Sequence, residues 1–355
     1  MTAGQSLAGG AAGIALRHLE TGNRPAAYEA LRHATAGGVS IADGASLFYG
    51  APALAFVLAT TDHPGLAQAR AATADGTAIV ARRQVDAAHR RIDRHRQPHY
   101  AEYDLIRGLT GLGVVLRRLG DHELLRQVLD YLVRLTEPRG ALPGWWCWNG
   151  PERRPSPVGG HANFGMAHGI AGPLALLALS HRDGITVAGH TTAINRISRW
   201  LDTWQQHSRG TIWWPQTITL TDLHRGTPTQ QTPLRPSWCY GTPGIARAQQ
   251  LAAHALRDTT RQHLAETAFT TCVTDPGQLR RLTDRSLCHG TAGLLATARR
   301  VACDALSPIP LDLVDDLHRQ ASPATNEPEG LLDGKAGANL VTAAATAWDA
   351  CLLLS

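Results

Sequence analysis

Two cysteines and a histidine have the clearest chemical potential in this sequence. Cys239 lies in the segment WCYGTPG, and Cys288 and His289 follow about 50 residues later in LCHGTAG. Two thiolates and an imidazole are a common ligand set for Zn²⁺, and three protein ligands leave the fourth tetrahedral position open, as in catalytic sites. The spacing alone is a moderate signal, because free cysteines are often simply buried.

Both segments are copies of a repeat in which a Gly-x-x-Gly step opens an apolar run. Six complete copies carry the glycine pairs Gly10 and Gly13, Gly108 and Gly111, Gly169 and Gly172, Gly241 and Gly244, Gly290 and Gly293, and Gly334 and Gly337. A seventh copy keeps Gly50 but has Ala53 at the second position. Such a recurrence indicates a repeat architecture.

The segments between the copies have helical periodicity. Apolar residues three or four places apart form one face of a helix. One such stripe contains Leu124, Val128, Leu132 and Leu135, and a shorter one contains Leu313, Val314 and Leu317. Each repeat therefore predicts an outer amphipathic helix, a loop with the glycines, and an inner helix that is apolar nearly all round and must be buried.

Glycines at the helix starts let neighbouring backbones approach closely. The sequence thus predicts an all-α fold, an α/α toroid of seven inner and seven outer helices with the glycine-rich turns at one end. We expect residues 1–355 to form it as a single domain, and residues 143–157 and 213–236 to be long loops beside its mouth. An irregular helical bundle is the alternative.

Unusual residues directly precede the first glycine in three copies: Cys239 and Tyr240, Cys288 and His289, and His168. If equivalent turns lie side by side, these residues converge. Because Cys288 and His289 are adjacent, they can share one ion only where the backbone is irregular, as in a loop.

The other four cysteines are predicted to be small buried hydrophobic residues. Cys147 lies in a tryptophan-rich stretch, and Cys272, Cys303 and Cys351 lie in helical surroundings. Six cysteines in 355 residues do not indicate a disulfide scaffold.

Composition limits the class of protein. With 43% hydrophobic and 18% charged residues, the chain is not mainly disordered. No apolar run reaches the ~18–20 residues that span a bilayer. The N-terminus lacks the pattern of a secretion signal, so we expect a cytoplasmic protein.

The basic residues are almost all arginines, with Lys335 the lone lysine and a net charge of +5. The charged run at residues 82–96 is typical of a solvated helix face, with a landing patch for an acidic peptide as the alternative. No nucleic-acid-binding module accompanies the charge, so nucleic acid is not an expected partner.

The segments HANFGMAHGIAG, WCYGTPG and LCHGTAG resemble the diagnostic motifs of the lanthipeptide cyclase family, the LanC-like proteins, and all seven repeats can be placed on that pattern. The resemblance implies an α/α toroid with one catalytic Zn²⁺ per chain. By the same resemblance, the metal ligands are Cys239, Cys288 and His289. The chain is somewhat short for the family, so we expect its accessory lobe to be reduced or missing.

Further catalytic residues are implied by the same resemblance. His168 would be the general acid, or at an earlier step the base, and Asp104 would orient it. Arg235 would stabilise an enolate or support a metal ligand, and Tyr240 would donate a hydrogen bond or line the site.

The implied activity is that of a lanthionine synthetase. Peptide cysteine thiolates would add to dehydroalanine or dehydrobutyrine residues of the same peptide and close lanthionine or methyllanthionine thioether rings. The implied partners are a dehydrated ribosomal precursor peptide and the dehydratase that acts before this enzyme. Three alternatives remain at this point: a zinc-dependent hydrolase, a zinc-bearing peptide-binding scaffold, and an enzyme that adds an external thiol such as glutathione to dehydrated residues.

Overall fold

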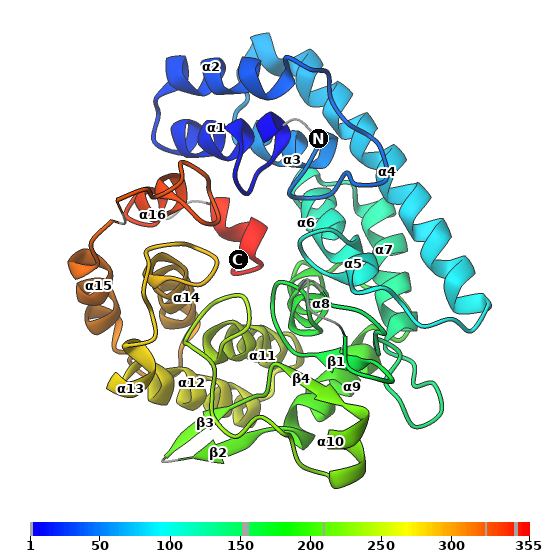
Figure 1. The fold of residues 1–355 in the computed structure, drawn as a ribbon. Coiled ribbons are helices and arrows are strands. Elements are labelled where there is room, and N and C mark those ends of the chain that lie inside the picture. The colour runs from blue at the N-terminus through cyan, green and yellow to red at the C-terminus, as the bar shows by residue number, and fades with distance from the viewer. Residues whose placement is uncertain (1–2, 151–155, 209, 324, 344–346) are drawn as a thin grey trace.

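Helices alternate between an inner and an outer position along the chain (Figure 1). The computed structural model describes residues 3–150, 156–208, 210–323, 325–343 and 347–355. Within these ranges the inner helices are α1 (Ala11–Glu20), α3 (Ala51–Leu58), α6 (Leu109–Leu119), α8 (Ala171–Arg182), α11 (Thr242–Leu256), α14 (Thr291–Asp304) and α16 (Lys335–Leu340). The outer helices are α2 (Arg24–Thr35), α4 (Ala67–Asp93), α7 (His122–Leu135), α9 (His190–Thr203), α12 (Thr259–Val273) and α15 (Leu311–Gln320).

The inner helices close a ring. Contacts join α1 to α3, α3 to α6, α6 to α8, α8 to α11 and α11 to α14, and α16 contacts α1. Gly337 of α16 also packs against Leu287, just before α14. The predicted all-α toroid is therefore confirmed, with seven inner and six outer helices among the described residues.

The chain after α16 turns inward, which is why the expected seventh outer helix is not found in the described ranges. The short 3-10 helix η3 (Trp348–Leu352) lies near the centre of the ring (Figure 1). Its residues are buried, and inner helices hold the segment: Arg247 of α11 donates to Leu354 O at 2.7 Å, and Arg117 of α6 donates to Ser355 O at 3.0 Å. The ring is thus filled from within.

The second glycine of each complete repeat is required by packing. A Cβ atom there would lie 2.0–2.7 Å from the carbonyl oxygen six residues earlier, closer than real Cβ atoms approach. This holds for Gly13, Gly111, Gly172, Gly244, Gly293 and Gly337. The turn before each inner helix therefore folds back directly onto the helix's first residues.

Backbone hydrogen bonds join these turns to one another, which places them at the same end of the ring. Six links are present, at N···O distances of 2.9–3.2 Å. Donor first, they are Leu7 to Phe48, Leu105 to Ala167, Ala167 to Cys239, Cys239 to Cys288, Cys288 to Leu332 and Leu332 to Ala8. We call this series the turn belt.

The described residues lack one link of the turn belt, between the turn before Gly50 and the turn before Gly108. The turn at Gly50 differs from the others: Gly50 has a positive φ of 76°, and Ser46 and Tyr49 pair their backbones with each other. This is also the repeat in which Ala53 replaces the second glycine.

The predicted helix faces are mostly confirmed. All four residues of the α7 stripe are buried, as is Val314 of α15, whereas Leu313 is 44% exposed. The prediction for Leu313 is wrong because α15, an outer helix, turns only a narrow stripe toward the ring, and that stripe contains Val314 and the buried His318.

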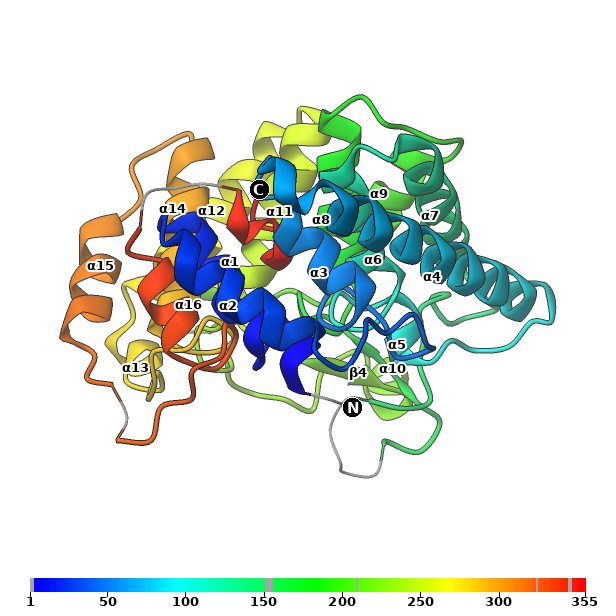
Figure 2. The same ribbon diagram turned by 90° about the horizontal axis from the view of Figure 1, so that it is seen from above.

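A small lobe precedes α11. Strand β1 (His161–Asn163) pairs antiparallel with β4 (Thr217–Thr219), and β2 (Gln206–Ser208) pairs with β3 (Thr211–Trp213). Helix α10 (Leu220–Arg225) follows β4. Seen from the edge of the ring, α10 and β4 lie on the same side as α5 (Tyr100–Tyr103), just before the Gly108 turn (Figure 2). The lobe therefore borders the glycine-rich end of the ring.

The long loop expected at residues 213–236 is therefore wrong in part, because it contains β4 and α10. Thr219 and Asp222 form a capping box that starts α10, a signal present in the sequence. Of residues 143–157, residues 151–155 lie outside the described ranges. The remaining short elements are η1 (Ala3–Gln5), η2 (Pro64–Leu66) and α13 (Pro276–Leu279). In the part of the chain that the structure describes, no helix is both long and apolar enough to cross a membrane.

The packing of the second glycines predicts a large effect of one methyl group. We expect Gly111→Ala to lower the free energy of unfolding by about 1–3 kcal/mol, since the added Cβ would lie 2.1 Å from Leu105 O. This outweighs the gain of about 1 kcal/mol in helix propensity. Urea denaturation measures the change. Gly9→Ala, where a Cβ meets no atom within 4 Å, is the control; equal urea midpoints for both variants would contradict the packing argument.

Candidate metal centre

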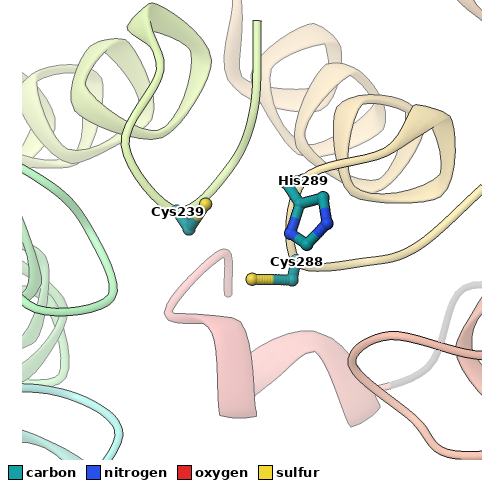
Figure 3. Close-up of side chains that lie close together, drawn as sticks. All are labelled: Cys239, Cys288 and His289. Atoms are coloured by element: carbon teal, nitrogen blue, oxygen red, sulfur yellow. The ribbon is translucent and has the colours of Figure 1, made fainter. Parts of the chain in front are cut away.

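The structure brings Cys239, Cys288 and His289 together at the glycine-rich end of the ring. Their ligand atoms all lie within 4.8 Å of one another. Cys239 comes from the loop before α11, while Cys288 and His289 come from the loop before α14 (Figure 3). Cys239 is buried, and the other two are half-buried, so the cluster is open on one side.

The turn belt fixes the spacing of the two cysteines. The backbone N–H of Cys239 donates to Cys288 O at 3.2 Å, and the N–H of Cys288 donates to Leu332 O at 3.0 Å. Cys288 and His289 lie in an irregular turn, as expected for neighbours that must point toward one ion. Backbone hydrogen bonds between the turns therefore place the two cysteines next to each other.

The donor set fits Zn²⁺. In a tetrahedral zinc site with Zn–S near ~2.3 Å and Zn–N near ~2.0 Å, ligand atoms are about 3.5–3.8 Å apart. The observed limit of 4.8 Å is about 1.0–1.3 Å wider, which side-chain rotation can close. Three ligands would leave one coordination position for a further group.

The two thiols differ in acidity. The Cys288 thiol, by donating a hydrogen bond to Cys239, lowers the pKa of Cys239 to about 7, against the opposing effect of burial. The same hydrogen bond and burial raise the pKa of Cys288. The positive charge of Arg235 lowers the pKa of both thiols. The hydrogen-bonded pair therefore favours a single thiolate, on Cys239. A bound cation would favour ionisation of both thiols.

A histidine–carboxylate pair lies next to the thiols. Nδ1 of His168 is 2.6 Å from Oδ2 of Asp104, a fully buried residue. The other carboxylate oxygen of Asp104 accepts the backbone N–H of Arg107 at 2.8 Å. The charge of His168 also acts on the Cys239 thiol. The fold thus brings together Asp104 and His168, which are 64 residues apart in the sequence.

Tyr240 and Arg235 border the same space. The ring of Tyr240 lies 6.0 Å from the His168 ring, tilted by 33°. Gly165 makes room for it, because a Cβ there would be 2.6 Å from the Tyr240 ring. Arg235 is exposed, and its charge reaches both thiols.

Two carboxylates of the site were missed by the sequence analysis. Oδ2 of Asp284 lies 3.5 Å from Nε2 of His289. The charge of Asp333 adds to the raised pKa of Cys288, after the hydrogen bond and burial. The repeat contained a signal for both: Asp284 stands six residues before Gly290, as Arg235 stands before Gly241, and Asp333 directly precedes a repeat glycine, as His168 does.

The remaining cysteines lie outside the cluster. Cys147, Cys272 and Cys351 are buried, as predicted. Cys303 is exposed, so its prediction is wrong; it lies near the end of α14, which is not covered there.

A helical toroid with a thiol and imidazole cluster at the mouth defines a recognisable class of protein, and comparisons with known proteins identify it. The family model of lanthionine synthetase C-like proteins matches residues 2–342. The chain therefore belongs to this family.

Two individual proteins are also similar. The nisin biosynthesis protein NisC of Lactococcus lactis subsp. lactis is 25% identical over 205 residues, which are 55% of this chain and 48% of that protein. The match thus spans about half the length of this relative. The structure of nisin cyclase has a TM-score of 0.83 and covers 100% of this chain and 93% of its own, at 19% identity. At that identity the likeness shows the shared fold.

The cluster predicts metal binding that depends on particular thiols. We expect the purified chain to contain about one zinc per molecule, and Cys288→Ala to lose most of it, because two remaining ligands bind weakly. Elemental analysis by mass spectrometry measures the ratio. Cys303→Ala, which removes an exposed thiol outside the cluster, should keep the metal. Full zinc content in Cys288→Ala would refute the assignment of this ligand.

Proposed function

We propose that this chain is a zinc-dependent lanthionine synthetase. It would close thioether rings by adding cysteine thiolates of a dehydrated peptide to dehydroalanine or dehydrobutyrine residues of the same peptide. The observation that carries the proposal is the cluster of Cys239, Cys288 and His289 beside the His168–Asp104 pair. Membership of the lanthionine synthetase C-like family supports the same chemistry.

Cys239, Cys288 and His289 would hold the zinc ion. When bound there, zinc would supply a low thiol pKa, so that a peptide cysteine reacts as a thiolate at neutral pH. A free thiol with a pKa near ~8.5 is only a few per cent ionised at that pH.

His168 would handle the proton of the addition. As the C–S bond forms, the C=C π bond breaks, and the electron pair moves toward the neighbouring carbonyl as an enolate. Asp104 faces Nδ1 of His168, which leaves Nε2 to deliver a proton to the α-carbon. The buried carboxylate would fix the orientation of the ring for this transfer.

Arg235 would stabilise the enolate, and Tyr240 would line the site. The guanidinium stays charged at any physiological pH, so Arg235 offers a constant positive field beside the thiols. The Tyr240 ring, next to His168, forms part of the wall against which the peptide is oriented. Orientation matters because a peptide with several reactive residues can close alternative rings.

The substrate would be a ribosomal precursor peptide that a dehydratase has already modified. The exposed arginines of the run at residues 82–96, on and just after α4, form a basic surface that suits acidic segments of such a peptide. We further propose that residues 1–355 act as one domain, since one hydrophobic cluster includes residues from Leu7 to Leu354. Six free cysteines suit a reducing cytoplasm.

The direct test uses a synthetic peptide that contains one dehydroalanine and one cysteine. Ring closure leaves the mass unchanged while the alkylatable thiol disappears, and tandem mass spectrometry locates the ring. A gain in mass equal to glutathione, added as competitor, would indicate addition of an external thiol. Peptide cleavage would indicate a hydrolase, and binding without any change in the peptide a scaffold; each of these outcomes would overturn the proposal.

The proton-transfer role of His168 predicts a large kinetic effect. We expect His168→Ala to lower the rate of ring closure about 10²–10⁴-fold, the range typical of a lost general acid or base. Zinc content should stay at the wild-type level, because His168 is not among the three ligands. His207→Ala in β2, an exposed histidine of the lobe, is the control. Wild-type rates in His168→Ala would exclude this role.

A further inference from the structure

A second carboxylate faces the proposed metal site from behind His289. In Figure 3 one ring nitrogen of His289 is directed toward the sulfur atoms, and the other points away from them. The nitrogen near the carboxylate is Nε2, which is 3.5 Å from Oδ2 of Asp284. Nδ1 is therefore the nitrogen left to face the thiols.

The loop holds the Asp284 carboxylate in place. Its Oδ1 accepts the backbone N–H of Ser286 at 2.8 Å, and its backbone carbonyl accepts the N–H of Thr291 at 3.0 Å. Gly290 leaves the space that the carboxylate fills, because a Cβ there would lie 2.3 Å from Oδ1. With Oδ1 occupied in this way, Oδ2 remains directed toward the imidazole.

An equivalent turn elsewhere in the ring has an asparagine at the position of Asp284. Asn163, six residues before Gly169, accepts the N–H of Gly165 with its side-chain oxygen at 2.8 Å and the N–H of Ile170 with its carbonyl at 2.9 Å. A Cβ at Gly169 would lie 2.5 Å from the Asn163 side-chain oxygen. The turn thus forms with a neutral amide, so folding does not require the negative charge of Asp284.

We propose that Asp284 is a positioning residue for the metal ligand His289. Its carboxylate accepts the Nε2 proton, which fixes the tautomer with the Nδ1 lone pair toward Cys239 and Cys288 and makes that nitrogen a stronger donor. The inference rests on the proposed zinc site and adds a residue to it.

The test is Asp284→Asn, in which the side-chain oxygen can keep the turn, as Asn163 does, while the amide N–H₂ would face the Nε2 proton. We expect zinc to bind about 10–100-fold more weakly, the usual cost of losing such a partner. Competition with a chromophoric chelator of known affinity measures the dissociation constant. Asp312→Asn is the control, because Asp312 is an exposed carboxylate of α15 outside the site. It should leave the affinity unchanged.

Unfolding of the metal-free proteins shows whether Asp284→Asn acts on the position of His289 or on the stability of the fold. Metal-free Asp284→Asn and wild type should unfold at the same urea concentration. An unchanged zinc affinity in Asp284→Asn, an equal loss in Asp312→Asn, or a lower urea midpoint of the metal-free Asp284→Asn protein would each overturn the proposal for Asp284. A wild-type chain that binds no zinc would instead overturn the proposed function itself.

Discussion

The close approach between the second glycine of each complete repeat and the carbonyl six residues before it is the constraint on which the rest of the structure depends. The contact folds these six turns back onto the starts of their inner helices, so the six turns have similar shapes. Turns of one shape can then hydrogen-bond to their neighbours through the turn belt. Since Cys239 and Cys288 are members of that belt, the same packing that closes the ring sets the distance between the two thiols.

Much of the fold was predictable because it follows from the sequence period. The glycine pairs mark the inner helices, and residues such as Leu124 and Val128 mark the buried side of an outer one. The inward course of the C-terminal segment was not predictable, because Leu354 and Ser355 accept hydrogen bonds from Arg247 and Arg117, which are distant in sequence. The lobe strands are too short to show an alternating pattern.

The candidate site was predictable to the extent that it obeys the repeat. Cys239 and Cys288 each stand two residues before a repeat glycine, and His168 stands one residue before another, so their convergence follows once the turns are side by side. Asp104 breaks this rule, since it stands four residues before its glycine, and only the resemblance to the family pointed to it. Asp284 obeys a second offset that becomes visible once the folded turns show which residue each glycine accommodates.

The position six residues before the first repeat glycine shows that one turn conformation accepts side chains of different charge. The position six residues before the glycine holds Asn163, Arg235 and Asp284 in three successive turns. In each turn the backbone carbonyl at this position accepts a hydrogen bond, whereas the side chains differ: a neutral amide, a cation beside the thiols, and a carboxylate behind the imidazole. Because the turn tolerates each of these, the ring can bring a positive and a negative charge to the candidate metal site without altering the packing that keeps Cys239, Cys288 and His289 together.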